Sequence, residues 1–531
     1  MTKPLYSFHA FLFPFEWRQR HGSPRSLLED QTNLELIRPN MESILSDWKL
    51  TPSWLEPTSL VQYNEANYFY DFVRPVLYGD DKAKFQVHYQ HQKARGSHYL
   101  IHHQPSNTIF KLEVDDIGVS FYNTGVGVLS IHCYNREHQE PDDILKINQF
   151  GRRVFPPFYG TNDPLVGSQE FFEDENWAAG LERVKKKELA NALVFEKDGE
   201  AWAIDDFTTP NTGPSLDAIP EMLNQLFPRS LVKIVHFTPV LDDRMFVVCW
   251  YGNDELANKI KTFDSISNDD SNDWWYKYVF VDGGMRTCQN DDLALQLLKG
   301  STNTRWINYG TLYGISRYSL VCLTGTLEQL QKPWANAAFL ISHMQTIYFK
   351  LAELALVQRA CLMRFSEEVT AIADLHHGDK HLPAKAGSLT RQFIRFINKI
   401  YFREVTAQDQ GIEMYDKLME QMRIHQQKDE LDKEIQELHQ YVTLEEERKR
   451  NDKLDVLTYL GSFFIGPSFI CGYLALYDFN DNVILVAALC VLASALTFAV
   501  VLASGRWRTC WLVTGVIFLL LVLFVLPNAN F

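Results

Sequence analysis

The end of the chain carries three apolar runs, residues 456–477, 483–503 and 509–526, and they constrain the fold more than any other feature. A helix needs roughly 20 mostly apolar residues to cross the ~30 Å hydrocarbon core of a bilayer. The first two runs reach that length, and the third is slightly shorter. No comparable run precedes residue 456. The sequence therefore predicts two to three transmembrane helices behind a large water-soluble region.

The charges around these runs predict an orientation. Arg448, Lys449 and Arg450 precede the first run, residues 478–482 contain no cation, and Arg506 and Arg508 separate the second run from the third. Cations on alternate sides follow the positive-inside rule and place the large N-terminal region in the cytoplasm. The alternative is a membrane protein whose short loops carry charges with no such meaning.

Composition narrows the class of protein. The 531 residues allow two to four domains, and the formal net charge of −15 excludes a broad surface for coating nucleic acid, so we expect no direct DNA or RNA binding. The eight cysteines form no CxxC pair, which is typical of a reduced cytoplasmic protein. Any site for an anion must be a local cationic pocket.

Residues 1–330 alternate between segments typical of strands and of helices, without a strict βαβ order. This pattern predicts an α+β (mixed α/β) cytoplasmic sensor domain, in one lobe or two. The aromatic run 6–17 is expected to be a strand with an edge or a bulge at Pro14. The other expected strands are 85–91, 109–114, 119–123, 126–133, 192–196, 231–239, 245–251, 276–282 and 318–324, and the expected helices are 141–150, 173–190, 219–227 and 291–299.

Residues 331–454 contain no strand pattern and predict a long α-helical stalk, with helices over 334–375, 389–401 and 411–453. In the last helix, Leu431, Ile435, Leu438 and Val442 step by 4, 3 and 4 residues, which is coiled-coil spacing. No proline or glycine lies between residues 413 and 460. We therefore expect this helix to continue without a break into the transmembrane region, residues 455–531.

A charged helix leading into closely spaced apolar runs at the C-terminus resembles the CorA family of metal-ion transporters, over roughly residues 390–503. The first membrane helix of that family commonly ends in a pattern like FIPLTFIAGIYGMN, and residues 464–477 here read FIGPSFICGYLALY. Phe464, Ile465, Phe469, Ile470 and Gly472 match without a gap, and the proline matches after a shift of one residue. The family's Gly-Met-Asn signature, however, falls on Ala475, Leu476 and Tyr477.

That departure, together with the large N-terminal region, resembles the CorA-like effectors associated with type III CRISPR systems. The resemblance implies a multi-pass protein of the bacterial inner (cell) membrane, built as a ring-like homo-oligomer in contact with the lipid bilayer. It implies a non-enzymatic channel or effector that disrupts the membrane in antiviral defence. Its activating ligand would be an adenine-nucleotide second messenger, either a cyclic oligoadenylate or an AMP conjugate of S-adenosylmethionine.

Two alternatives stay open. One is a divalent metal-ion transporter for magnesium or cobalt that lacks the usual selectivity motif. The other is a membrane-tethered scaffold or enzyme, although none of the common catalytic or phosphate-binding motifs is present.

The segment 151–160 (GRRVFPPFYG) is the strongest candidate for a ligand site. Arg152 and Arg153 can present forked donors to phosphate, and Phe155, Phe158 or Tyr159 can stack on a purine. The alternative is that the arginines complement a helix C-terminus and the aromatic rings pack in the core.

Other residues are weaker candidates. Arg317 closes a glycine-containing loop, residues 309–318, that can approach a ligand or form a tight turn. Asp217 can accept a ribose hydroxyl or lie near a helix start. The candidate pore residues, by analogy with the family, are Thr458, Ser462, Ser468, Tyr477 and Asp478.

The histidines form two clusters in the sequence, one at residues 88, 91, 98, 102 and 103, and one at residues 376, 377 and 381. Neither cluster is accompanied by a cysteine. We therefore expect solvated or hydrogen-bonded histidines and no metal site.

Overall fold

The computed structural model describes residues 3–20, 34–42, 47–51, 59–79, 85–155, 191–204, 219–241, 244–267, 270–333, 335, 337–375 and 381–474. The chain divides into two compact units. The first contains Met1–His376 and Ala384–Leu438, and the second contains His377–Pro383 and His439–Phe531. All of the strands and all of the described candidate ligand-binding residues below belong to the first unit, whereas the candidate pore residues belong to the second.

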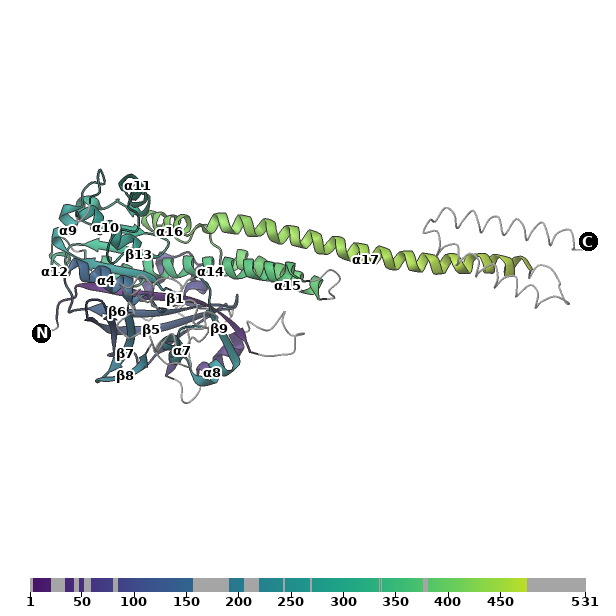
Figure 1. Ribbon diagram of the computed structural model, residues 1–531, viewed down its shortest axis with the longest axis horizontal. Coiled ribbons are helices and arrows are strands. Elements are labelled where there is room, and N and C mark those ends of the chain that lie inside the picture. The colour runs from purple at the N-terminus through teal and green to yellow at the C-terminus, as the bar shows by residue number, and fades with distance from the viewer. Residues whose placement is uncertain are drawn as a thin grey trace, which may run out of the picture. The chain divides into compact units, whose positions relative to one another are not determined.

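The first unit is organised around one mixed sheet of 13 described strands (Figure 1). Its main path runs β11-β12-β13-β10-β1-β6-β5-β4-β7-β8, while β2, β3 and β9 pair beside that path. The strands β10 and β13 pair in parallel, and the other described pairs are antiparallel. The strands are β1 (Ser7–Gln19), β2 (Trp48–Leu50), β3 (Gln86–His91), β4 (His98–His103), β5 (Thr108–Tyr122), β6 (Val126–Asn135), β7 (Asn191–Lys197), β8 (Glu200–Ile204), β9 (Val235–Pro239), β10 (Phe246–Gly252), β11 (Thr302–Asn303), β12 (Leu312–Ile315) and β13 (Ser319–Thr324).

The strand β1 lies in the middle of the sheet, not at an edge, and Pro14 explains how a proline can sit there. On one side β1 pairs with β6 along most of its length. On the other side its pairing with β10 ends at Leu12, and its pairing with β9 begins at Phe15. Proline has no N–H for a ladder, so it is tolerated where the partner strand changes. The expected edge or bulge is therefore replaced by a gap between two partner strands.

Helices cover both faces of the sheet. His9 of β1 contacts Asn148 of α4 (Pro141–Gly151), whereas Glu16 forms an ion pair with Arg364 of α14 (Ile347–Ala373) at 3.2 Å. Odd and even positions of a strand face opposite sides, so α4 and α14 lie on opposite faces. The core is dense on the α4 face: a Cβ on Gly127 would stand 2.4 Å from the ring of Phe15.

The remaining described helices are short, apart from three near the end of the described chain. They are α1 (Leu34–Met41), α2 (Leu60–Tyr68), α3 (Arg74–Tyr78), α7 (Glu221–Leu226), α8 (Arg229–Ile234), α9 (Asp254–Lys259), α10 (Ser271–Phe280), α11 (Asp291–Ser301), the 3-10 helix η2 (Ile307–Tyr309), α12 (Leu327–Leu330), α13 (Phe339–Gln345), α15 (Leu382–Lys399), α16 (Asp409–Gln421) and α17 (Ile424–Leu474).

Several secondary-structure predictions are wrong. The segment 276–282, expected as a strand, belongs mostly to the helix α10, which begins after the N-cap Asp270. Among the buried rings of α10, those at positions 274, 275 and 278 follow helical spacing, which the local aromatic composition concealed. The expected strand 231–239 is the end of α8 followed by β9. The expected helix 411–453 is α16 and α17, separated at Arg423, whose φ is 56°.

The predicted fold class, with its C-terminal transmembrane helices, is contradicted. Among the described residues, no helix combines the length and the apolar character needed to cross a bilayer. The first apolar run belongs to α17 up to Leu474, and it is interrupted by Gly461, Gly466 and Pro467 behind a highly charged segment. The runs 483–503 and 509–526 lie outside the described residues. What the structure describes is a large mixed sheet with helices on both faces.

Candidate ligand sites

The predicted arginine segment follows α4, which ends at Gly151, a position where the packing leaves no room for a side chain. A Cβ on Gly151 would stand 2.7 Å from Ile101 and 2.8 Å from the ring of Phe11. The carbonyl of Arg152 then accepts the N–H of Met245 at 2.8 Å, and Arg153 forms an isolated antiparallel bridge with Arg244. This pairing places arginines from two distant segments beside each other.

These arginines surround Tyr318. The guanidinium of Arg152 lies 5.3 Å from the centre of the Tyr318 ring, and that of Arg244 lies 5.8 Å from it. Each is a cation–π contact. Arg152 is only 4% exposed, whereas Arg153 and Arg244 are half-buried. We call Arg152, Arg153, Arg244 and Tyr318 the arginine cluster.

Asp282 is an acidic group in the electrostatic field of this cluster. Burial raises the pKa of its carboxyl, and the charges of Arg152 and Arg153 act in the opposite direction. The carboxylate accepts hydrogen bonds from the backbone N–H and the hydroxyl of Thr287, at 3.0 and 2.9 Å. Asp282 is therefore held by its own loop while it offsets part of the arginine charge.

The other predicted ligand residues are only partly placed together. Phe155 packs against the hydrophobic core, as the alternative interpretation expected. Arg317 directly precedes Tyr318, and its carbonyl accepts from Nη1 of Arg359 on α14 at 3.4 Å. Phe158, Tyr159 and Asp217 lie outside the described residues.

Three of the five predicted pore residues lie on α17, and the other two lie outside the described residues. The hydroxyl of Thr458 donates to the carbonyl of Leu454 at 2.7 Å, which is a bond within the helix. Ser468 is exposed on α17, and Ser462 lies in α17 with its side chain outside the description. Tyr477 and Asp478 lie outside the described residues.

Sequence reasoning missed a cavity of about 550 Å³ at the opposite end of the sheet. Its walls come from β2 and the residue before it, the end of β3, the β7–β8 hairpin and the segment after α7. The lining residues are Asp47, Trp48, His91, Lys93, Lys197, Asp198, Glu200, Ala201, Trp202, Gln225, Leu226, Phe227 and Pro228. We call it the aromatic cavity, because rings form its inner wall. A volume of this size suits a small organic ligand.

His91 is the member of the first histidine cluster that lines this cavity. Its ring stacks on Trp202 with centres 5.3 Å apart and planes at 9°, and it meets the edge of Trp48 at 5.0 Å. Burial lowers the pKa of His91 to about 4, so the imidazole is neutral at pH 7. Among the described residues, no group of three or more potential ligands is placed to hold a metal ion.

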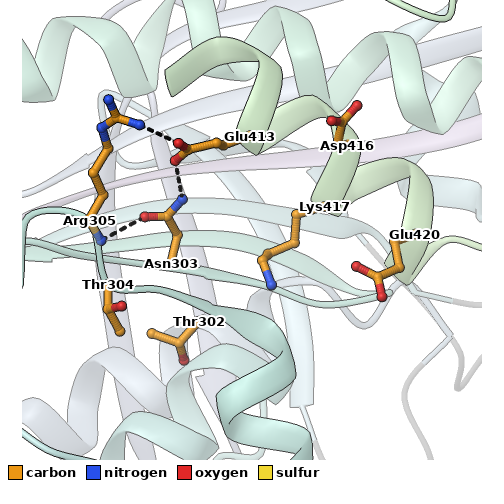
Figure 2. A pocket seen from close by; sticks show the side chains of 8 residues that line it. All are labelled: Thr302, Asn303, Thr304, Arg305, Glu413, Asp416, Lys417 and Glu420. Atoms are coloured by element: carbon orange, nitrogen blue, oxygen red, sulfur yellow. Dashed lines mark hydrogen bonds and ion pairs between the residues drawn. The ribbon is translucent and has the colours of Figure 1, made fainter. Parts of the chain in front are cut away.

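A second hollow, the polar groove, lies between β11 and α16 and measures about 590 Å³. Figure 2 shows Glu413 of α16 reaching toward Arg305 and Asn303, with which it forms an ion pair and a hydrogen bond of 3.1 Å. Lys417 donates to the carbonyl of Gly300 at 2.5 Å. The Arg305–Glu413 pair and the bond from Lys417 to the backbone connect this part of the sheet region to α16.

Ser7, His9 and Asn148 have the residue types of a catalytic triad, but all three are buried in the core. His9 lies between the hydroxyl of Ser7 at 2.7 Å and the Asn148 side-chain oxygen at 2.8 Å, with the thiol of Cys249 at 3.4 Å. All four residues are buried, and His9 is 0% exposed. Burial lowers the pKa of His9 to about 4, so the ring acts as a neutral hydrogen-bonding link inside the core.

In a comparison with known proteins, neither a protein-family model nor a curated protein matches the chain. The resemblance to the CorA family therefore stays a prediction drawn from the sequence.

Proposed function

We propose that the first unit is a receptor for a phosphate-bearing ligand of the nucleotide type, bound at the arginine cluster. The observation that carries the proposal is the convergence of Arg152 and Arg244 on one ring, Tyr318, with Arg153 beside them. These residues come from the end of α4, the start of β10 and the turn before β13. A concentration of guanidinium groups in a chain of net charge −15 favours a specific local role over general surface charge.

The chemistry of the cluster suits a phosphate on an aromatic nucleotide. Guanidinium groups donate forked hydrogen bonds to phosphate oxygens, and they are more weakly hydrated than ammonium groups. The buried Arg152 holds the Tyr318 ring in position, while the half-buried Arg153 and Arg244 are the groups that can reach a ligand. In this proposal Asp282 balances part of the charge until the anion arrives.

The arginine cluster lies next to contacts that connect it to the helices α14 and α16. Arg359 of α14 donates to the carbonyl of Arg317, next to Tyr318. At the preceding position of α14, Gln358 donates to the hydroxyl of Tyr415 on α16 at 2.8 Å. A ligand that binds one arrangement of these contacts more tightly would shift α16 and the start of α17 toward it. The effector output, ring-like assembly and ion transport implied by the resemblance stay predictions.

Ligand binding to the purified full-length protein tests the proposal. Isothermal titration would use cyclic oligoadenylates, the AMP conjugate of S-adenosylmethionine and inorganic phosphate, with magnesium as a separate arm. The variant is Arg153→Gln combined with Arg244→Gln, which removes two charges and spares the buried Arg152. Charge-assisted hydrogen bonds contribute about 1.5–3 kcal/mol each, so we expect affinity to fall at least about tenfold.

The matched control is Arg305→Gln in the polar groove, which removes an arginine that takes no part in the arginine cluster. It should leave affinity unchanged. Binding should also weaken as salt concentration rises, because the contact is ionic. Nucleotide binding that is equally tight in the double variant would exclude the arginine cluster. Binding of magnesium alone would favour the transporter alternative.

A further inference from the structure

We propose that the aromatic cavity is a second, separate binding site, and that its ligand is a neutral flat heteroaromatic compound, such as a nucleobase or an uncharged nucleoside. This site differs from the arginine cluster in position, in its lining and in the charge of the ligand that it accepts. Nothing in the proposed phosphate site requires it.

The inner wall of the cavity is built from rings in well-defined stacks. Trp202 stacks on His91, and Trp48 stacks on Phe227 with ring centres 6.1 Å apart and planes at 17°. The edge-to-face contact between Trp48 and His91, at 5.0 Å and 81°, joins the two stacks. The rings are fixed by their neighbours: the indole N–H of Trp48 donates to the carbonyl of Leu226 at 2.7 Å. A preformed wall of flat faces favours a flat ligand, because stacking needs no reorganisation.

Two polar atoms in this wall have no hydrogen-bond partner in the part of the chain that the structure describes. They are Nδ1 of His91 and Nε1 of Trp202, and both are buried. His91 is 5% exposed overall and lines the cavity. Leaving a buried donor or acceptor without a partner is costly, so such groups mark places where a ligand completes the bonding. The indole N–H donates only, while a neutral imidazole has one donor and one acceptor nitrogen. A heteroaromatic ring with nitrogen or carbonyl groups on its edge matches both.

The mouth of the cavity argues against an anionic ligand. It carries two lysines, Lys93 and Lys197, and three carboxylates, Asp47, Asp198 and Glu200, so the formal charge is 2 − 3 = −1. The ammonium of Lys93 already lies 2.8 Å from Asp47. That of Lys197 donates to the carbonyls of Lys93 and Arg95, at 3.1 and 3.2 Å. Both ammonium groups are therefore bonded to neighbouring segments of the chain, and they leave no surplus positive charge for a phosphate.

The test is equilibrium binding of neutral and charged versions of one ring to the full-length protein, with adenine and adenosine against AMP and ATP, and with guanosine and riboflavin as further neutral rings. Competition from the arginine cluster is removed in the Arg153→Gln, Arg244→Gln background. We expect at least one neutral compound to bind in that background. AMP and ATP should bind there at least about tenfold more weakly than adenosine, because they bring charge to a mouth that is already negative.

Two substitutions of Trp202 separate its contributions. Trp202→Phe keeps an aromatic face and removes the N–H, and we expect roughly tenfold weaker binding from the lost hydrogen bond. Trp202→Ala also removes the stacking surface and should weaken binding by a further factor of about ten. The matched control is Trp306→Phe, a tryptophan that packs beside Arg305 away from the cavity and should leave binding unchanged. Thermal melting of each variant establishes that it is folded.

The outcomes are decisive in both directions. Neutral-ring binding that falls in the Trp202 series and persists in the arginine double variant supports the cavity, whether or not the arginine cluster binds phosphate. Three results would each overturn it: no neutral compound binds, ATP binds the double variant as tightly as adenosine does, or a folded Trp202→Ala variant binds as well as the wild type.

Discussion

His9 makes the stability of the first unit depend on pH in a way that can be calculated. The ring is 0% exposed and is held between Ser7 and Asn148. Burial lowers its pKa from 6.5 to about 4, against the smaller effect of the Asn148 hydrogen bond. Between those two values the unfolded chain binds a proton that the folded chain excludes. Stability therefore falls as the pH falls from 6.5 toward 4, and the loss is complete below the folded pKa.

The size of this effect follows from the two pKa values. The full difference corresponds to about 3 kcal/mol, because each factor of ten in proton affinity is worth about 1.36 kcal/mol. At pH 5, where the unfolded His9 is nearly all protonated and the folded one is nearly all neutral, the loss is about 2 kcal/mol. This is a substantial share of the 5–15 kcal/mol that typically stabilises a domain.

The assay is urea unfolding of the full-length protein, followed by tryptophan fluorescence, at pH 7.5, 6 and 5. The perturbation is His9→Gln, which offers the neighbours an amide in place of the imidazole and cannot be protonated. At pH 7.5 we expect the variant to be less stable, since glutamine fits the core less well. At pH 5 the difference in unfolding free energy should be smaller by about 2 kcal/mol. The control is His439→Gln on the exposed surface of α17, which keeps His9 and should keep the full wild-type loss. A stability gap between wild type and His9→Gln that is the same at all three pH values would refute the reasoning.

Two further predictions concern the same unit. Gly127→Ala should destabilise it by about 1–3 kcal/mol in urea unfolding, because the new Cβ would stand 2.4 Å from the buried ring of Phe15. Gly387→Ala in α15 should instead stabilise it by up to about 1 kcal/mol, because no atom beyond the adjoining helix backbone lies within 4 Å of the new Cβ. Equal effects of the two substitutions would contradict the packing argument. Burial raises the pKa of Glu65 from 4.5 to about 7, so between these values the unfolded chain has released a proton that the folded chain keeps. Stability therefore falls as the pH rises from about 4.5, and the loss is complete above about pH 7. Glu65→Gln should therefore flatten the loss of stability between pH 5 and pH 7, and a parallel pH profile in wild type and variant would argue against it.

Part of the arginine cluster could be predicted from local sequence. The twin arginines stand out because they follow a helix with an acidic first turn and a terminal glycine, and the structure has α4 over Pro141–Gly151. No local sequence pattern predicted a role for Arg244. It reaches the cluster only because its backbone bridges to Arg153, 91 positions earlier in the chain. The burial of Arg152 could not be predicted either, because its contacts Met245 and Tyr318 lie far away in the sequence.

The sequence by itself determined the elements whose character is local. The aromatic run 6–17 is the strand β1, the segment 126–133 lies in β6, and the coiled-coil spacing at 431–442 is part of α17. The segments 109–114 and 119–123, expected as two strands, belong to the single strand β5. Residue alternation and helical spacing depend only on neighbours along the chain, so they can be read directly. The same reading failed at 276–282, where aromatic residues suit a strand or a helix and packing against the sheet decides between them.

Only the tertiary structure decided the aromatic cavity and the central place of β1. Trp48, His91, Trp202 and Phe227 belong to four separate segments, and pairing between β2, β3 and the neighbouring strands brings their rings together. Pro14 is accommodated because β10 and β9 meet opposite it, which no feature of the run 6–17 indicates. Contacts of this kind depend on which distant strands pair and in which register, and a local pattern of residue types carries no information about that choice.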